Sequence, residues 1–201
     1  MHAKPDLRVF LKWTIAGSGS VIADVIHLNQ MAKNNKTSRG NASQFFIAGE
    51  LCRRGHSAVV TLGNCPNTDI LCSNKQGTRF VHVQVKTFIP GKPTCSVGPK
   101  AEIDYGPKFF WILGGIPEPD QDADFVYYII PSKVMAKNIS AAHQNWLRTP
   151  GKKGQAHRDN KIRTVKLPPK TTALGWSIAK YRERWDLIDT KLLDPKSKNG
   201  G

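Results

Sequence analysis

The segment Arg79–Phe88 constrains the fold of this chain more than any other, because its side chains alternate between two kinds. Successive side chains of an extended chain point to opposite faces, so one face would carry three β-branched residues: Val81, Val83 and Val85. The other face would carry three polar residues: His82, Gln84 and Lys86. Buried polar groups need partners. The pattern therefore predicts a strand with one face in the core and chemistry on the other.

A second short apolar run, Asp69–Cys72, comes before this strand, and the residues Asn74–Gly77 separate the two. Asparagine and glycine favour a tight turn, so the two segments are predicted to pair as a hairpin. This pairing would bring the carboxylate of Asp69 close to Gln84 and Lys86. An aspartate, an amide oxygen and a lysine together suit a cation site with a neighbouring charge stabiliser.

These residues also carry a resemblance to a known family. Asp69, fourteen intervening residues and then Gln84-Val85-Lys86 resemble the hallmark of the PD-(D/E)XK nuclease superfamily, an aspartate followed by an acid-x-lysine on the next strand. A helix expected at 41–54 is similar to the first helix of that family, and the resemblance covers roughly residues 40–130. It implies an α/β fold with a restriction-endonuclease-like core, in which helices flank a central mixed β-sheet.

The resemblance implies a metal-dependent endonuclease that hydrolyses the phosphodiester bonds of DNA, with Mg²⁺ or Mn²⁺ as cofactor. In the implied site, Asp69 and Gln84 hold the metal. Lys86 then orients the attacking water or neutralises charge on the phosphate. The implied catalytic residues are therefore Asp69, Gln84 and Lys86.

Two glutamines depart from the family pattern. Gln84 stands where the family usually has Glu or Asp, and Gln44 stands where a first-helix glutamate would fall. An amide oxygen can bind a metal but brings no negative charge. Accessory candidates are Gln44, Glu50 and His82, and a displaced carboxylate would come from Glu50, Glu102 or Asp104. The departures leave an alternative open: a catalytically inactive nucleic-acid-binding or accessory module on the same fold.

The charge of the chain favours a polyanionic partner. Lys and Arg number 30 against 15 Asp and Glu, which gives a formal net charge of +15. A basic loop at 148–161 follows a helix predicted at 132–147. Its cations are predicted to contact phosphates without reading sequence: Arg148, Lys152, Lys153, Arg158 and Lys161. DNA is the expected partner. RNA and a homodimer remain open, as does a merely solvated basic surface.

The length of 201 residues suits one domain with a full core. We expect a flexible N-terminal extension at 1–39, the nuclease-like domain at 40–194 and a disordered tail at 195–201. Further elements of the domain are expected as strands at 109–113, 125–130 and 162–167, a loop at 89–108 and a final helix at 176–193.

Several classes of protein lack support in the sequence. The four cysteines, Cys52, Cys65, Cys72 and Cys95, show no zinc-ligand spacing, and we expect them to be free thiols in a reducing cytoplasm. No apolar run is long enough to span a membrane, so no membrane partner is expected. The phosphate-binding motifs G-x-x-x-x-G-K-[ST] and strand-linked G-x-G-x-x-G are absent from the sequence.

Overall fold

The computed structural model describes residues 21–193, with side chains from residue 37 onward. The chain divides into two compact units, residues 1–38 and residues 39–201. The predicted tail at 195–201 and the first twenty residues of the predicted N-terminal extension lie outside the described residues. No helix within the described range is long and apolar enough to cross a membrane.

Helix α2 (Val21–Arg53) begins well before the helix predicted at 41–54, because no proline interrupts the sequence between its ends. It stops before Gly55, whose φ of 89° is the left-handed conformation that favours glycine after a helix. In the second unit its buried side chains recur every four residues: Ser43, Ile47 and Leu51. Phe45 and Cys52 on the same helix are exposed.

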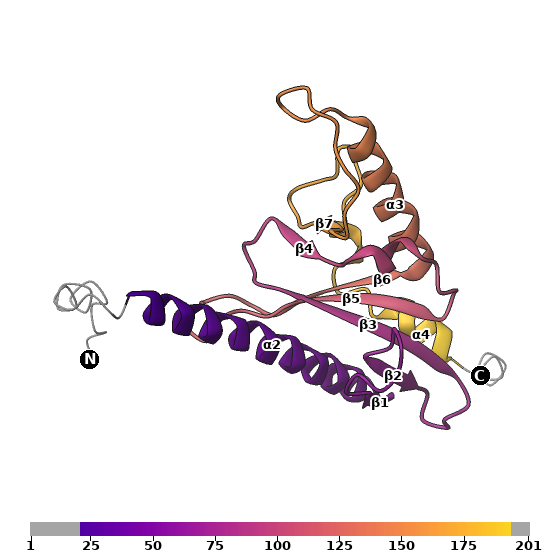
Figure 1. Cartoon of the computed structure of the whole chain (residues 1–201). Coiled ribbons are helices and arrows are strands. Elements are labelled where there is room, and N and C mark those ends of the chain that lie inside the picture. Colours follow the sequence, from indigo (N-terminus) through magenta and orange to yellow (C-terminus); the bar gives the residue numbers. More distant parts are fainter. Residues whose placement is uncertain (1–20, 194–201) are drawn as a thin grey trace. The chain divides into compact units, whose positions relative to one another are not determined.

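The second unit is built on a five-stranded mixed sheet of order β1-β2-β3-β5-β6 (Figure 1). Its strands are β1 (Ser57–Val60), β2 (Ile70–Ser73), β3 (Phe80–Phe88), β5 (Phe109–Gly115) and β6 (Val126–Pro131). The pair β3–β5 is parallel and the other three pairs are antiparallel. The predicted hairpin is therefore present as β2–β3. The predicted α/β fold with a central mixed sheet between helices is confirmed.

Each face of the sheet has its own hydrophobic core. On one face, the valines of β3 pack with side chains of α2 and of α4 (Asp186–Leu192), among them Ile47, Leu51 and Ile188. On the other face, Phe88 and Trp111 pack against helix α3 (Ser132–Arg148) and a two-stranded sheet of β4 (Thr94–Ser96) and β7 (Thr164–Lys166). Figure 1 shows α3 and the small sheet on the side of the main sheet opposite α4. The alternation along β3 is thus confirmed.

Two segments differ from their predictions. The loop expected at 89–108 contains β4 and a 3₁₀ turn, η1 (Pro99–Glu102). The helix expected at 176–193 is divided into η2 (Ala179–Tyr181) and the short helix α4. Between them Glu183 adopts a φ of 52° and its N–H donates to Tyr127 O at 2.9 Å. The Tyr127 N–H in turn donates to the Glu183 carboxylate at 2.8 Å, so both backbone groups of Tyr127 find partners at the outer edge of β6, which is an edge strand of the main sheet.

All four cysteines are free thiols in the described chain, as predicted. Cys72 and Cys95 are buried, and burial raises the pKa of each thiol to about 12. A thiol with such a pKa stays protonated at neutral pH, so neither is a nucleophile. Cys52 and Cys65 are exposed.

A close approach at the end of β5 explains the glycine pair Gly114–Gly115. A methyl group on Gly115 would lie 2.5 Å from Val126 Cγ1 and 2.8 Å from the Phe88 ring. We therefore expect Gly115→Ala to lower the free energy of unfolding by about 1–3 kcal/mol, the usual effect of overpacking a core. Urea denaturation measures this loss.

Gly49 provides the matched control, because nothing lies within 4 Å of a Cβ atom built there and it sits on the exposed side of α2. Gly49→Ala should raise the free energy of unfolding by about 0.5–1 kcal/mol through helix propensity and a less flexible unfolded chain. Equal stabilities for the two variants would contradict the explanation that Gly115 is required because Val126 and Phe88 leave no room for a methyl group.

Candidate active site

Asp69 lies directly before β2, at the point where the hairpin begins to pair with β3. Its backbone N–H donates to Val83 O at 2.9 Å and so continues the ladder. Its carboxylate reaches across the pair, where Oδ2 accepts hydrogen bonds from the Val85 N–H at 2.7 Å and from the side-chain amide of Gln84. The hairpin therefore fixes the carboxylate directly beside Gln84.

The loop that enters β2 is held by two threonines. The hydroxyl of Thr61 donates to Thr68 O at 2.5 Å, and the hydroxyl of Thr68 is 3.1 Å from Nδ1 of His82. Asn67 adopts a φ of 58°, a conformation in which asparagine is one of the more favourable residues. These contacts set the direction in which the chain reaches Asp69. His82 lies two residues before Gln84 on the same face of β3, and its side chain is exposed.

The electrostatics of Asp69 are set by burial and by two lysines. Burial of the carboxyl group is the largest influence and raises the pKa of Asp69 above its ordinary value. The hydrogen bond from Val85 and the positive charges of Lys86 and Lys100 act in the opposite direction. Lys86 comes from β3, and Lys100 comes from η1. The result is a partly desolvated carboxylate with cationic neighbours.

Lys100 is a site residue that sequence reasoning did not identify. It lies in the proline- and glycine-rich segment expected to be a loop, where Pro99 opens the turn of η1. Lys100 is more than thirty residues from Asp69 in the sequence. The packing of η1 against α3 places it where its positive charge lowers the pKa of Asp69. Only the proline at the start of a short turn was visible in the sequence.

The donor set suits a hard cation. Within residues 37–193, no group of three or more His, Cys, Asp or Glu side chains is placed to hold a metal ion. Asp69 supplies one carboxylate and Gln84 an amide oxygen, and Mg²⁺ commonly binds through one or two carboxylates while it keeps several waters. The amide nitrogen of Gln84 faces Asp69. Binding of a cation through Gln84 Oε1 therefore requires the amide to turn over.

The other candidate carboxylates are engaged elsewhere. Glu50 is paired with Arg53 at 2.7 Å and with Arg54 at 2.9 Å. Glu102 is paired with Arg163 at 2.6 Å, and Asp104 accepts a hydrogen bond from the Gly106 N–H at 2.9 Å. Gln44 is half-buried on α2. Of the carboxylates named from the sequence, Asp69 is the one that the structure sets against Gln84.

The cations predicted to bind nucleic acid are all exposed on one segment. Arg148 is the last residue of α3, and the other four lie between α3 and β7: Lys152, Lys153, Arg158 and Lys161. The segment is anchored to α3, because Asp159 accepts from His143 at 2.9 Å and His157 Nδ1 lies 3.1 Å from Trp146 O. It is a tethered basic surface.

Comparisons with known proteins give one structural likeness. No protein-family model and no curated protein matches the chain. Among solved structures the chain is similar to a bacterial homing endonuclease, I-Ssp6803I, with 16% sequence identity and a TM-score of 0.46. The match covers 80% of this chain and 96% of that chain. At this identity and TM-score the likeness assigns no function.

The raised pKa of Asp69 predicts how this carboxylate affects stability. As pH rises through the ordinary range of aspartate, the unfolded chain releases its proton before the folded chain does, so the folded state loses stability. Asp69→Asn removes the charge, and its amide oxygen still accepts from Val85. We expect its melting temperature without metal to exceed that of the wild type by a few degrees at pH 7.

The difference in melting temperature should disappear below the ordinary pKa of aspartate, where both chains are neutral at this position. Differential scanning calorimetry in EDTA across this range measures it. A lower melting temperature for Asp69→Asn at pH 7 would show that hydrogen bonding of the carboxylate outweighs its desolvation.

Proposed function

We propose that this protein is a metal-dependent endonuclease that hydrolyses phosphodiester bonds of DNA, as a PD-(D/E)XK-type enzyme with a Q-x-K strand. The observation that carries the proposal is the carboxylate of Asp69, fixed across the hairpin against Gln84 and Val85 and influenced by Lys86. A partly buried carboxylate with a raised pKa is uncommon away from functional sites.

In the proposed mechanism, Asp69 and Gln84 bind the metal, and the two lysines stabilise negative charge. Asp69 and Gln84 would hold Mg²⁺ or Mn²⁺ through their oxygens. A bound divalent cation would lower the pKa of a coordinated water and polarise the scissile phosphate. Lys86 lies two residues beyond Gln84 on the same face of β3, where its ammonium group can orient the attacking water or stabilise charge that develops on the phosphate. Lys100 adds a second positive charge at the same place.

The net charge of +15 and the basic segment after α3 support DNA as the substrate. Contacts from exposed lysines and arginines to phosphates hold a duplex but carry no sequence information. RNA as a second substrate, a homodimer and a cytoplasmic location remain predictions from the sequence.

One alternative function has a specific observation in its favour. Asp69 is the one carboxylate set against Gln84, so the proposed metal site carries a single negative charge from the protein. A nucleic-acid-binding module without cleavage would share the fold and the basic surface. Magnesium binding separates the two: ligand binding to the folded state raises the melting temperature. If the protein is a metal-dependent enzyme, Mg²⁺ should raise the melting temperature of the wild type but not that of Asp69→Ala.

Plasmid cleavage by the full chain in Mg²⁺ and in Mn²⁺ tests the proposed reaction. Asp69→Ala should abolish cleavage, and Lys86→Ala should slow it about 10²–10³-fold, as for loss of one charge-stabilising group. Both variants should retain DNA binding, since neither belongs to the basic segment. Cleavage that survives in Asp69→Ala would remove this site from the proposal. Intact binding without cleavage in the wild type would favour the inactive module.

The basic segment makes a separate prediction about affinity. Replacing Lys152 and Lys153 with alanine should weaken DNA binding and reduce the slope of log K against log salt by about 2, roughly one unit for each phosphate contact. The control removes the same charge from the outer side of α3, through Lys133→Ala and Lys137→Ala, which are also exposed. Equal slopes for the two double variants would show that DNA affinity depends on the net charge of the protein and not on where the lysines lie.

A further inference from the structure

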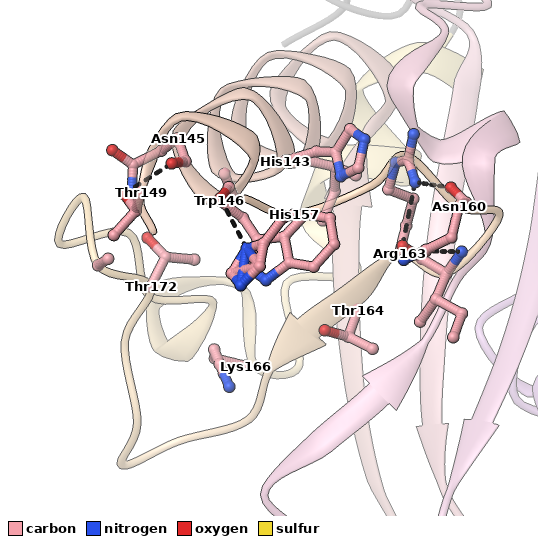
Figure 2. A pocket seen from close by; sticks show the side chains of 14 residues that line it. His143, Asn145, Trp146, Thr149, His157, Asn160, Arg163, Thr164, Lys166 and Thr172 are labelled. Atoms are coloured by element: carbon pink, nitrogen blue, oxygen red, sulfur yellow. Dashed lines mark hydrogen bonds between the residues drawn. The ribbon is translucent and has the colours of Figure 1, made fainter. Parts of the chain in front are cut away.

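A pocket of about 540 Å³ lies between the C-terminal half of α3, the basic segment that follows it and strand β7 (Figure 2). It is separate from the site at Asp69, whose residues do not line it. Its walls all come from the stretch 139–173, and they include Trp146 of α3, Lys166 of β7 and Thr172. A pocket of this size exceeds the volume of a single nucleobase and has no role in the proposed hydrolysis.

An aromatic surface forms one wall of this pocket. The rings of Trp146 and His157 stack with centroids 4.1 Å apart and planes 17° apart, and His143 lies 5.6 Å from Trp146 with planes 23° apart. Figure 2 shows Trp146 and His157 side by side at the pocket. Trp146 is nevertheless 37% exposed. Because His157 already stacks on Trp146, a further planar ring would stack on the part of the Trp146–His157 pair that remains exposed.

Polar and charged groups surround the aromatic surface. Asn145, Asn160 and Thr164 are polar residues of the lining. The side-chain oxygen of Asn160 accepts from the Ile162 N–H at 2.8 Å, which leaves its amide N–H groups as donors. Amide and hydroxyl groups pair with the donors and acceptors on the edges of nucleobases. The cationic side chains of the lining are Arg163, which is buried and paired with Glu102, and Lys166 of β7, which is exposed. A stacking surface, hydrogen-bonding groups and the exposed ammonium group of Lys166 match the base and the phosphate of a nucleotide.

The pocket lies on the same side of the main sheet as the polar face of β3. The connection runs through η1, where Lys100 acts on Asp69 and Glu102 binds Arg163 at 2.6 Å. Arg163 is itself a buried wall residue of the pocket. A nucleic acid bound at Asp69 and along the basic segment would therefore follow this side of the protein.

We propose that this pocket binds one unpaired nucleobase of the nucleic acid, stacked against the exposed part of the Trp146–His157 pair. The proposal rests on the proposed function for its partner, nucleic acid, but not on cleavage. A base inside a duplex is already stacked and paired on its edges, so only an extrahelical, terminal or single-stranded base can enter. The pocket would make the protein prefer DNA that is distorted or unpaired near the bound site.

The test compares two DNA duplexes that differ by one base. One is fully paired and the other carries a single extrahelical 2-aminopurine, whose fluorescence falls when it stacks. Binding is measured with the full chain in EDTA, so that cleavage cannot contribute. The wild type should bind the bulged duplex more tightly and quench its fluorescence. Trp146→Ala should abolish the quenching and weaken binding of the bulged duplex about 10-fold, within the usual range for loss of one base–aromatic stack.

A second variant guards against loss of folding in Trp146→Ala. Ala173 is an exposed residue of the pocket wall, so Ala173→Trp fills the pocket without removing a core side chain. It should have the same selective effect on the bulged duplex. The control is Lys137→Ala, whose side chain is exposed elsewhere on α3, and it should change both affinities equally. Circular dichroism establishes that each variant is folded.

The outcomes separate this proposal from the proposed function. A selective loss for the bulged duplex in the folded pocket variants supports the pocket, whether or not the protein cleaves DNA. Pocket variants that affect both duplexes equally, or neither, overturn it even if Asp69-dependent cleavage is found. Absence of DNA binding in the wild type overturns both.

Discussion

The register of the β2–β3 hairpin is the constraint on which the proposed site depends. It pairs Ile70 with Val83, so that the next residue back, Asp69, reaches the Val85 N–H with its carboxylate while its own N–H bonds Val83 O. A shift of one residue would exchange the two faces of the strand and send Gln84 and Lys86 into the core. The valines of β3 prevent that shift, because they are buried against α2 and α4. Core packing on one face therefore maintains the chemistry on the other.

The site is held in a state that folding alone would not favour. Burial of Asp69 opposes its ionisation, and the neighbouring lysines only partly offset this. A carboxylate that accepts one backbone hydrogen bond and lies against an amide has few partners for its charge. Burial together with few partners for the charge accounts for the raised pKa of this carboxyl group.

The two candidate sites share one side of the sheet and one connecting element. The segment 89–108 supplies both β4, which pairs with β7, and η1, which carries Lys100 toward Asp69 and Glu102 toward Arg163. The sequence of this segment offered little beyond its prolines and glycines. In the fold it joins the hairpin to the pocket beside α3, so its irregular structure positions residues of both.

The alternation of β3, the turn residues Asn74–Gly77 before it and the apolar run of β5 were sufficient to predict these strands, the hairpin and the meeting of Asp69 with Gln84, whereas the central mixed sheet was implied by the family resemblance. These features depend on local periodicity and short-range pairing, which the order of residues specifies directly. The extent of α2, the break before α4 and the placing of Lys100 were not predictable in this way. At Glu183 the backbone has a left-handed φ of 52° and bonds to Tyr127 O at the edge of β6, which is where the helical pattern of 176–193 is interrupted. Such outcomes depend on which distant backbone and side-chain groups are available as partners, and only the tertiary structure brings those together.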